Sequence, residues 1–409
     1  MRHYGFLIRK LCFLGSILFF LLSGCQPQPT AQLADAPTVV ADPSPSSQPA
    51  AQVPTSSSTP VDLQSPTAAA ALSTPSVTPD ALDSTRPPSF TSPPPAVPPP
   101  PPASTTLLFT GIIVPARCVQ AALDANGNPD YPYEEVRDII SGADLAVGTF
   151  NATMSDASPH TGCILTYVLV GSPDNADALA RAGFDVMSVA TNHIKNCNSN
   201  TCGDRAFFDT QANLQRVGIL PVGAGKNLAE AMQPVVVTVN GIRFGFVSLG
   251  QIEPMAFAGQ DSPGIAVLNE ENLRSAIAAA RRVSDVVIAM PHWGPEDVPV
   301  PNWSQRTLAR VAVEAGADLV VGNHTHVVQA VQEIDGVKVF YGLGNFVFDQ
   351  GLQDHRQGVI LEIKFEGTHL VGYELIPTHV DPDGRVHLAG ALESTEIIQR
   401  IEQASQAIK

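Results

Sequence analysis

Residues 316–326 read Gly-Ala-Asp-Leu-Val-Val-Gly-Asn-His-Thr-His, and this stretch decides the fold. Residues 318–321, which are apolar after Asp318, are typical of a buried strand, and glycine and polar side chains follow them at once. In layered α/β proteins, ligand sites collect at the carboxyl ends of such strands. If the segment stays extended, the imidazoles of His324 and His326 share one side of it. The stretch therefore predicts a strand that ends in a binding site.

The sequence on either side alternates between short apolar runs and helical periodicities. Ser172 would cap one of the helices, and Gly183 would end it. This alternation favours parallel strands with helices packed on them. Further strands are predicted at 107–114, 144–150, 185–190 and 285–289, and helices at 133–141, 173–182, 204–217, 270–282, 303–315 and 395–407.

Antiparallel pairs are added to this pattern. Residues 235–239 and 242–249 flank Asn240-Gly241, the dipeptide favoured in type I′ hairpin turns. A second hairpin at 330–341 turns at Asp335-Gly336, and residues 359–365 and 370–376 form a further pair. Parallel strands mixed with hairpins predict two sheets packed together with helices outside. The predicted fold class is α/β, as a four-layer α-β-β-α sandwich.

The N-terminal residues predict an exported lipoprotein. A basic start precedes an apolar run, residues 11–22, which is too short to span a bilayer and fits the h-region of a secretory signal. Leu22-Ser23-Gly24-Cys25 resembles the bacterial lipobox, so cleavage before Cys25 and lipidation of its thiol are expected. The alternative is an ordinary signal peptide or an anchor helix with a chance cysteine.

A long polar stretch separates this anchor from the rest of the chain. Residues 26–103 are rich in Pro, Ala, Ser, Thr and Gln and have no apolar periodicity, so they cannot offset the entropy of ordering. The predicted organisation is a signal peptide at 1–24, the lipidated Cys25 with a disordered linker at 25–103, and one domain at 104–409. The lipid would hold that domain at the extracytoplasmic face of a membrane.

Charge and cysteine content narrow the function classes. The formal net charge of −16 argues against binding to nucleic acid and against a polybasic membrane patch. An even number of cysteines in an oxidising compartment suggests two disulfides, with Cys197 and Cys202 as the local pair and Cys118 with Cys163 by elimination. A thiolate metal site is the rival interpretation, although Cys-x4-Cys alone is a weak zinc signal.

Histidines follow several of the predicted strands. His193 comes after Asn192 at the end of one strand, His292 precedes Trp293-Gly294 at the end of another, and His324 and His326 end the third. Neutral imidazole is the commonest metal ligand, and an Asn oxygen can join it. A lone histidine would more often be structural, but this set predicts a site for a divalent metal ion.

These residues also carry a family resemblance. The chain resembles the CapA family of capsule-synthesis (poly-γ-glutamate capsule) proteins, within the calcineurin-like metallophosphoesterase superfamily. The matching stretches run from Leu107 to about Gln350, and they are Ala190-Thr191-Asn192-His193, Gly223-Ala224-Gly225, His292-Trp293-Gly294-Pro295-Glu296, residues 316–326 and Tyr341-Gly342-Leu343-Gly344-Asn345-Phe346.

The resemblance implies a role for each matching residue. Asn192, His292 and His324 match the ligands of one metal ion, and His326 matches a ligand of a second. His193 matches the histidine that assists the leaving group or the oxyanion. Arg117 and Asn151 are the residues that would bind an anion or substrate, and Asn151 or water would complete the metal shell. A metal-activated water would be the nucleophile of such a site.

The chain also departs from the family pattern. Ile112 stands where the family usually has a metal-binding aspartate, Asn151 stands near the usual Asn-Leu-Glu motif, and Asn196 replaces a further aspartate. Two carboxylates are what hold two cations against their mutual repulsion. Without these carboxylates the site could hold one divalent ion more easily than two. The alternative is an empty, non-catalytic site. The replacement carboxylates to be tested are Asp156, Asp204, Glu296 and Asp349.

Three functions fit these patterns. The first is a metal-dependent hydrolase acting on a phosphoester or on a link in an envelope polymer. The second is a non-catalytic protein that binds or guides a polymer such as poly-γ-glutamate. A solute-binding lipoprotein is the third, but it does not explain the histidines.

Several other residues are expected to have structural roles only. Trp293 and Trp303 are expected to pack in the core, and Gly223-Ala224-Gly225 to form a turn. The histidines expected at the surface or in loops are His160, His355, His369, His379 and His387.

Overall fold

The computed structural model describes residues 104–197, 202–252 and 254–409. The predicted signal peptide, Cys25 and the linker lie outside these residues. Within the described part of the chain, no helix is long and apolar enough to cross a bilayer.

The larger sheet has eight strands and mixes parallel with antiparallel pairs. Its order is β18-β17-β16-β1-β2-β5-β6, with β15 pairing with β1. β1, β2, β5 and β6 run parallel, whereas β16, β17 and β18 are antiparallel. The strands are β1 (Ser104–Ile113), β2 (Leu145–Phe150), β5 (Val186–Ser188), β6 (Leu220–Val222), β15 (Asn345–Val347), β16 (Gln357–Glu366), β17 (His369–Val380) and β18 (Val386–Leu388).

The second sheet has six strands in the order β13-β14-β12-β11-β9-β8. β9, β11, β12 and β14 are parallel. At the two edges of the sheet, β8 pairs with β9 and β13 pairs with β14 in antiparallel hairpins. The strands are β8 (Val235–Val239), β9 (Ile242–Gly250), β11 (Val286–His292), β12 (Leu319–Val321), β13 (Val331–Ile334) and β14 (Val337–Phe340). Two short pairs complete the strands described: β3 (Thr153–Met154) with β4 (Val170–Gly171), and β7 (Ala224–Gly225) with β10 (Gly264–Ile265).

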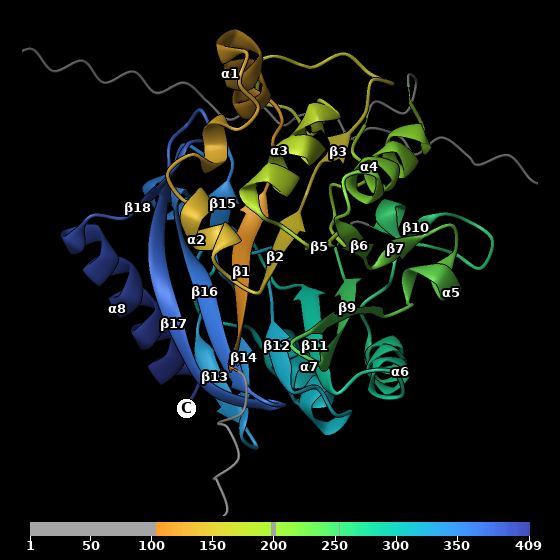
Figure 1. Ribbon diagram of the computed structural model, residues 1–409, viewed down its shortest axis with the longest axis vertical. Helices are drawn as coiled ribbons and strands as arrows, with labels where there is room; N and C mark the ends of the chain where they lie inside the picture. The colour runs from red at the N-terminus through yellow and green to blue at the C-terminus, as the bar shows by residue number, and fades with distance from the viewer. Residues whose placement is uncertain (1–103, 198–201, 253) are drawn as a thin grey trace, which may run out of the picture. The chain divides into compact units, whose positions relative to one another are not determined.

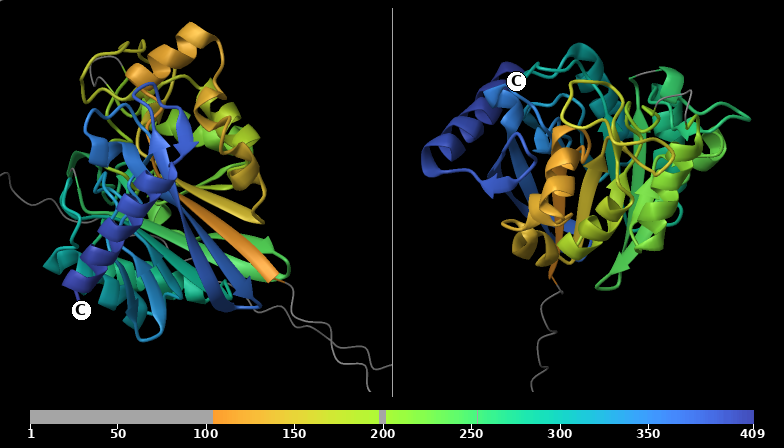
Figure 2. Two further views of the ribbon diagram at one scale, coloured as in Figure 1. Left: turned by 90° about the vertical axis from the view of Figure 1, so that its left-hand side faces the viewer. Right: turned by 90° about the horizontal axis from the view of Figure 1, so that it is seen from above.

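Helices cover the outer faces of both sheets (Figure 1, Figure 2). α1 to α4 pack on the larger sheet, α6 and α7 pack on the second, and α8 lies along β17 and β13. The helices are α1 (Cys118–Asn126), α2 (Arg137–Ser141), α3 (Asp174–Ala182), α4 (Arg205–Arg216), α5 (Leu228–Ala231), α6 (Glu270–Arg281), α7 (Trp303–Glu314) and α8 (Ala391–Ala407), with 3-10 turns η1 (Tyr131–Tyr133), η2 (Pro254–Ala256) and η3 (Gln353–Arg356).

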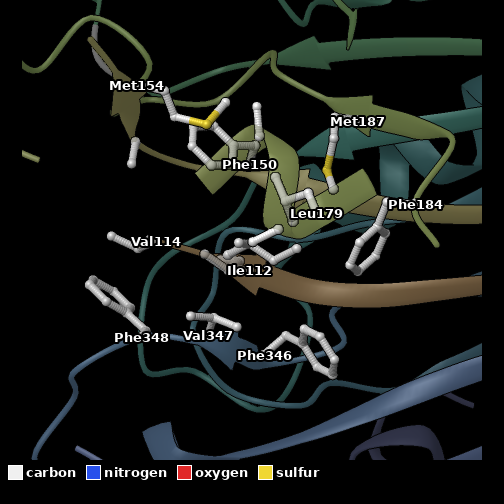
Figure 3. Packing of buried hydrophobic residues seen from close by; sticks show 14 of the residues in the cluster. Ile112, Val114, Phe150, Met154, Leu179, Phe184, Met187, Phe346, Val347 and Phe348 are labelled. Carbon is white, nitrogen blue, oxygen red and sulfur yellow. The ribbon is translucent and has the colours of Figure 1, made fainter. Parts of the chain in front are cut away.

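Side chains alternate between two separate cores along the central strands. On β1, Leu107 and Phe109 pack between the two sheets against residues such as Phe244, while Leu108 and Ile112 face the helices on the outside. Strands that are buried on both faces read as continuous apolar runs, which is why these segments stand out in the sequence. Figure 3 shows the outer core around Ile112. The predicted four-layer α-β-β-α sandwich is confirmed.

Both hairpin turns are confirmed by their backbone geometry. Asn240 and Gly241 have φ values of 50° and 81°, and Asp335 and Gly336 have φ values of 47° and 85°, as a type I′ turn requires. Gly223 also has a positive φ of 96°, but Ala224–Gly225 is a short strand rather than part of a longer turn.

Helix boundaries and one tryptophan differ from expectation. The segment expected as one helix, 133–141, begins with the 3-10 turn η1, which contains Pro132, so the α-helix starts at Arg137. The terminal helix starts at Ala391, before the expected residue 395. Trp293 is fully buried as expected, but Trp303 is 73 % exposed because it occupies the first turn of α7 on its outer side. An apolar residue beside a helix start was therefore wrongly assigned to the core.

Candidate functional site

The polar residues singled out by the sequence meet where parallel strands of both sheets end. Asn151 directly follows β2, Asn192 and His193 follow β5, and His292 ends β11. His324 and His326 lie just after β12. All of these side chains are buried. Both sheets thus present their carboxyl ends to one site, as expected for a layered α/β fold.

Three donor atoms converge at the centre of this site. His292 Nε2 lies 2.9 Å from Asn192 Oδ1 and 3.2 Å from His324 Nδ1. A neutral imidazole nitrogen carries either one proton or one lone pair, so it cannot form ordinary hydrogen bonds to both neighbours. Ligand bonds of about 2.0–2.1 Å separate adjacent ligands by about 3.0–3.4 Å, so the same spacing suits three ligands of one metal ion.

His326 is oriented by a second asparagine. Its Nδ1 lies 2.8 Å from Asn345 Oδ1, and the Asn345 amide donates to the His355 carbonyl at 2.7 Å. His326 therefore donates from Nδ1 and carries its lone pair on Nε2, the arrangement typical of a metal-binding histidine. His324 and His326 have positive φ values of 107° and 59°. Such backbone strain in non-glycine residues is concentrated at functional sites.

His193 is held by two asparagine side chains. Its backbone N–H donates to Asn151 Oδ1 at 3.1 Å, so that amide oxygen is already in use. The Asn196 amide lies 2.6 Å from His193 Nδ1 and donates to it, which places the ring proton on Nε2. His193 is thus fixed as a hydrogen-bond donor through Nε2.

Burial keeps all four histidines uncharged at neutral pH. Burial, reinforced by the neighbouring imidazoles, lowers the pKa of His324 to about 3 and that of His193 to about 4. The pKa of His326 falls to about 4, again mainly through burial, and that of His292 lies well below its usual range. Neutral imidazole is the form that binds metal ions.

The four candidate replacement carboxylates lie at different distances from the histidines and have different partners. Asp349 is paired with Arg117 and accepts the Cys118 N–H at 3.1 Å, and Asp204 is paired with Lys195 at 2.7 Å. Glu296 Oε1 lies 3.9 Å from Nε2 of both His324 and His326.

The remaining expected positions contribute no carboxylate to the histidines. Asp156 is exposed in a loop, and Ile112 is buried in hydrocarbon. Glu296 is thus the carboxylate of the tested set that borders the histidines.

This donor set fits one divalent ion better than two. Among the described residues, no group of three or more His, Cys, Asp or Glu side chains is arranged to hold a metal ion. The convergent set has two histidines plus Asn192 and carries no charge, which suits a single ion completed by water. A second ion would add repulsion without a carboxylate within ligand distance to offset it.

Two histidines of the site, His193 and His326, line a cavity of about 420 Å³. Arg117 lines it, but its guanidinium is committed to Asp349 and to the Thr166 carbonyl at 3.2 Å, so the group proposed for anion binding already has partners. The lining residues are Arg117, Leu165, Thr166, Tyr167, Leu169, His193, Glu296, Asp297, His326, Phe348, Gln350 and His355.

Several cavity residues were not identified as site residues from the sequence, His355 and Tyr167 among them. His355 was expected at the surface, but it is buried and pairs with Asp297 at 2.7 Å. Tyr167 is 79 % exposed and stacks on the His193 ring at 6.1 Å. Neither lies at the end of a strand, so no strand-end pattern could have found them. The expected cysteine pairs, Cys118 with Cys163 and Cys197 with Cys202, are joined as disulfides in the structure.

The family model described as "Bacterial capsule synthesis protein PGA_cap" matches residues 106–350. The chain belongs to this family. Every residue of the histidine site lies within the match. The PGA biosynthesis protein CapA of Bacillus subtilis (strain 168) is 28 % identical over 285 residues, which are 67 % of this chain and 73 % of that one. The capsule biosynthesis protein CapA of Bacillus anthracis is 26 % identical over 304 residues, 72 % of each chain.

Solved structures resemble this PGA_cap protein more distantly. A phosphatase from Mycoplasma pneumoniae aligns over 69 % of this chain and 96 % of its own, with 11 % identity and a TM-score of 0.45. A 5′-nucleotidase precursor from Thermus thermophilus covers 75 % of this chain and 59 % of its own, with 13 % identity and a TM-score of 0.41. Both TM-scores lie below 0.5, so the fold described above rests on strand order and layers alone.

Proposed function

We propose that this PGA_cap protein is an exported lipoprotein that acts on a capsule or envelope polymer of the poly-γ-glutamate type, using one divalent ion at the histidine site. The observation that carries the proposal is the convergence of Asn192 Oδ1, His292 Nε2 and His324 Nδ1 inside the family match. The names of two relatives support the polymer class: the Bacillus subtilis relative is a PGA biosynthesis protein and the Bacillus anthracis relative is a capsule biosynthesis protein.

The chemistry follows from the donor set. When bound, a divalent ion would polarise a carbonyl or phosphoryl oxygen and lower the pKa of a coordinated water. Asn192, His292 and His324 would hold it. His326, oriented by Asn345, presents its Nε2 to the cavity beside Glu296.

His193 would stabilise developing negative charge. Its Nε2–H is set by the Asn196 contact to Nδ1, and its pKa of about 4 keeps the ring neutral. A neutral imidazole that donates a hydrogen bond suits an oxyanion better than it suits proton abstraction. Of the two roles that the resemblance implies for His193, we therefore propose stabilisation of the oxyanion rather than assistance to the leaving group.

A second function is favoured by a separate observation. Ile112 is fully buried among apolar side chains, and Asp349 is paired with Arg117, so neither supplies a carboxylate to a metal centre. A site reduced in this way would bind or guide the polymer without cleaving it.

Hydrolysis distinguishes the two functions. The purified chain would be incubated with γ-linked glutamate oligomers and with a panel of phosphoesters, each with Zn²⁺, Mn²⁺ or Mg²⁺ and after chelation. Metal-dependent cleavage that is lost in His292→Ala supports the hydrolase. Binding of the oligomers without cleavage supports the guiding role, and neither binding nor cleavage would overturn the proposal.

A further inference from the structure

One wall of the histidine cavity is a loop that leaves the fold and returns to the same place. Residues 155–169, called the rim loop from here on, run between the paired strands β3 and β4. The Thr153 N–H donates to the Leu169 carbonyl at 2.8 Å, and the Ser155 N–H donates to the Gly171 carbonyl at 3.1 Å. Compact loops of this length with adjoining ends are frequently functional.

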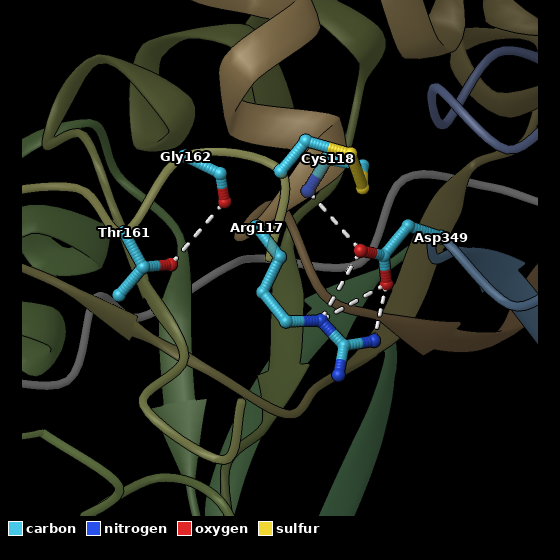
Figure 4. The surroundings of a disulfide bond; sticks show 6 residues. Arg117, Cys118, Thr161, Gly162 and Asp349 are labelled. Atoms are coloured by element: carbon cyan, nitrogen blue, oxygen red, sulfur yellow. Dashed lines mark hydrogen bonds and ion pairs between the residues drawn. A yellow bond between two sulfur atoms is a disulfide. The ribbon is translucent and has the colours of Figure 1, made fainter. Parts of the chain in front are cut away.

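Two consecutive residues fasten the rim loop over the site. Arg117 donates to the Thr166 carbonyl at 3.2 Å, and Cys118 is disulfide-bonded to Cys163 (Figure 4). Asp349 fixes both of them, because it pairs with the Arg117 guanidinium and accepts the Cys118 N–H. The rim loop is therefore attached to residues 117–118, and Arg117 also lines the cavity beside His193 and His326.

The rim loop presents apolar side chains beside a polar floor. Leu165 is 89 % exposed and Tyr167 is 79 % exposed, yet both line the cavity. The Tyr167 ring lies nearly parallel to His193, with an interplanar angle of 15°. Singly exposed apolar residues need no explanation, but two that line one cavity together with neutral imidazoles form a surface that a ligand can cover.

We propose that Leu165 and Tyr167 determine specificity by contacting the apolar segments of a γ-linked glutamate chain. The inference rests on the proposed function and names the part of the polymer that is recognised. A γ-linked repeat places two methylene carbons in the backbone between successive amides, whereas an α-linked repeat places them in the side chain. The apolar wall then contacts backbone methylenes while the histidine floor faces amide and carboxylate groups.

The linkage of the polymer provides the test. Labelled γ-linked and α-linked glutamate decamers have the same number of residues and the same formal charge, so their affinities for the purified chain can be compared by fluorescence anisotropy in buffer with Mg²⁺. The wild type should prefer the γ-linked decamer. Leu165→Ala and Tyr167→Ala should each reduce that preference about five- to tenfold, because each loses apolar contact area. Tyr167→Phe should retain it.

A matched control is available on α8. Leu392 is 84 % exposed, similar to Leu165, and does not line the cavity. Leu392→Ala should leave the γ-to-α preference unchanged. Since all of these side chains are exposed, the variants should fold like the wild type, which a thermal unfolding curve checks.

The outcomes separate the inference from the proposed function. If the wild type binds neither decamer, the proposed function fails. If the wild type prefers the γ-linked decamer and the Leu165 and Tyr167 variants keep that preference, the inference alone is overturned. The double variant Cys118→Ser/Cys163→Ser should weaken the preference as well, because the rim loop loses one of its two attachments and keeps only the Arg117–Thr166 hydrogen bond. If a folded double variant keeps the full preference for the γ-linked decamer, the Cys118–Cys163 disulfide does not position the rim loop for recognition.

Discussion

His292 Nε2 lies 2.9 Å from Asn192 Oδ1, although the two residues come from different sheets. β11 of the second sheet supplies the histidine, and the loop after β5 of the larger sheet supplies the asparagine. The contact therefore exists only when the two sheets are packed together. Folding and assembly of the site are the same event.

The orientation of His193 is open to direct measurement. Asn196→Asp replaces a donor by an acceptor, so the ring proton should move from Nε2 to Nδ1 and the pKa of His193 should rise. Ring ¹⁵N chemical shifts should show an Nε2–H tautomer in the wild type and an Nδ1–H tautomer in the variant. Asn196→Ala is the control that removes the contact without reversing it. An Nδ1–H tautomer in the wild type would contradict the assigned role.

Buried and exposed tryptophans should differ sharply in their effect on stability. Trp293 is fully buried, stacks on Tyr341 and donates to its carbonyl at 2.9 Å. Trp293→Ala should lower the free energy of unfolding by about 3–5 kcal/mol. Trp303→Ala, at the exposed start of α7, should change it by about 0.5 kcal/mol or less. Urea unfolding curves measure both, and equal effects would refute the assigned burial.

A histidine far from the cavity should link stability to pH. His387 Nδ1 and Nε2 contact Glu135 and Asp381, each at 2.7 Å. Burial lowers the pKa of His387, but these two hydrogen bonds outweigh it and the net shift is upward. The stabilisation is therefore complete below the ordinary pKa of about 6.5 and is lost as pH rises through the folded value.

Unfolding measured across this pH window checks the assignment. His387→Gln should remove part of the loss of stability above about pH 6.5. His160→Gln is the control, since the His160 side chain is as exposed as that of His387 but contacts one carboxylate, Asp124, rather than two. Identical pH profiles for the His387 variant and the wild type would show that the two carboxylates do not stabilise the charged ring.

The proposed function includes a lipid on Cys25 that anchors the protein to a membrane. Cys25→Ser should move the protein from the membrane fraction to the soluble fraction of cells, because the lipid contributes about 0.8 kcal/mol for each buried CH₂ group. Metabolic labelling with a fatty acid should mark the wild type only. A labelled or membrane-bound Cys25→Ser protein would exclude a lipid on this residue.

Strands and hairpins could be predicted because their signals are local. Asn240-Gly241 and Asp335-Gly336 specify their turns through their own backbone preferences. The strand-end histidines could be found for a related reason, since parallel strands deliver their last residues to one edge. In contrast, Arg117 and Asp349 are 232 positions apart in the sequence, and no local pattern pairs them.

The exposure of single side chains and the positions of loops could not be predicted from the sequence in the same way. Tyr167 and His355 reach the cavity because the rim loop and η3 fold back over it, which depends on a disulfide and on packing. Trp303 shows the converse, because its apolar side chain suggested burial while its position on α7 leaves it in solvent. Sequence periodicity specifies which face of an element is buried, but it does not specify the contacts of a loop.

The metal content of the purified chain tests the central claim most directly. After loading with a divalent ion and removal of excess, elemental analysis should give about one ion per chain, and His292→Ala should give none while remaining folded. His369→Ala, which alters an exposed histidine on β17, should keep the ion. Two ions per chain would show that Glu296 or another group completes a binuclear centre. No ion in the wild type, or unchanged binding in His292→Ala, would contradict the proposed site.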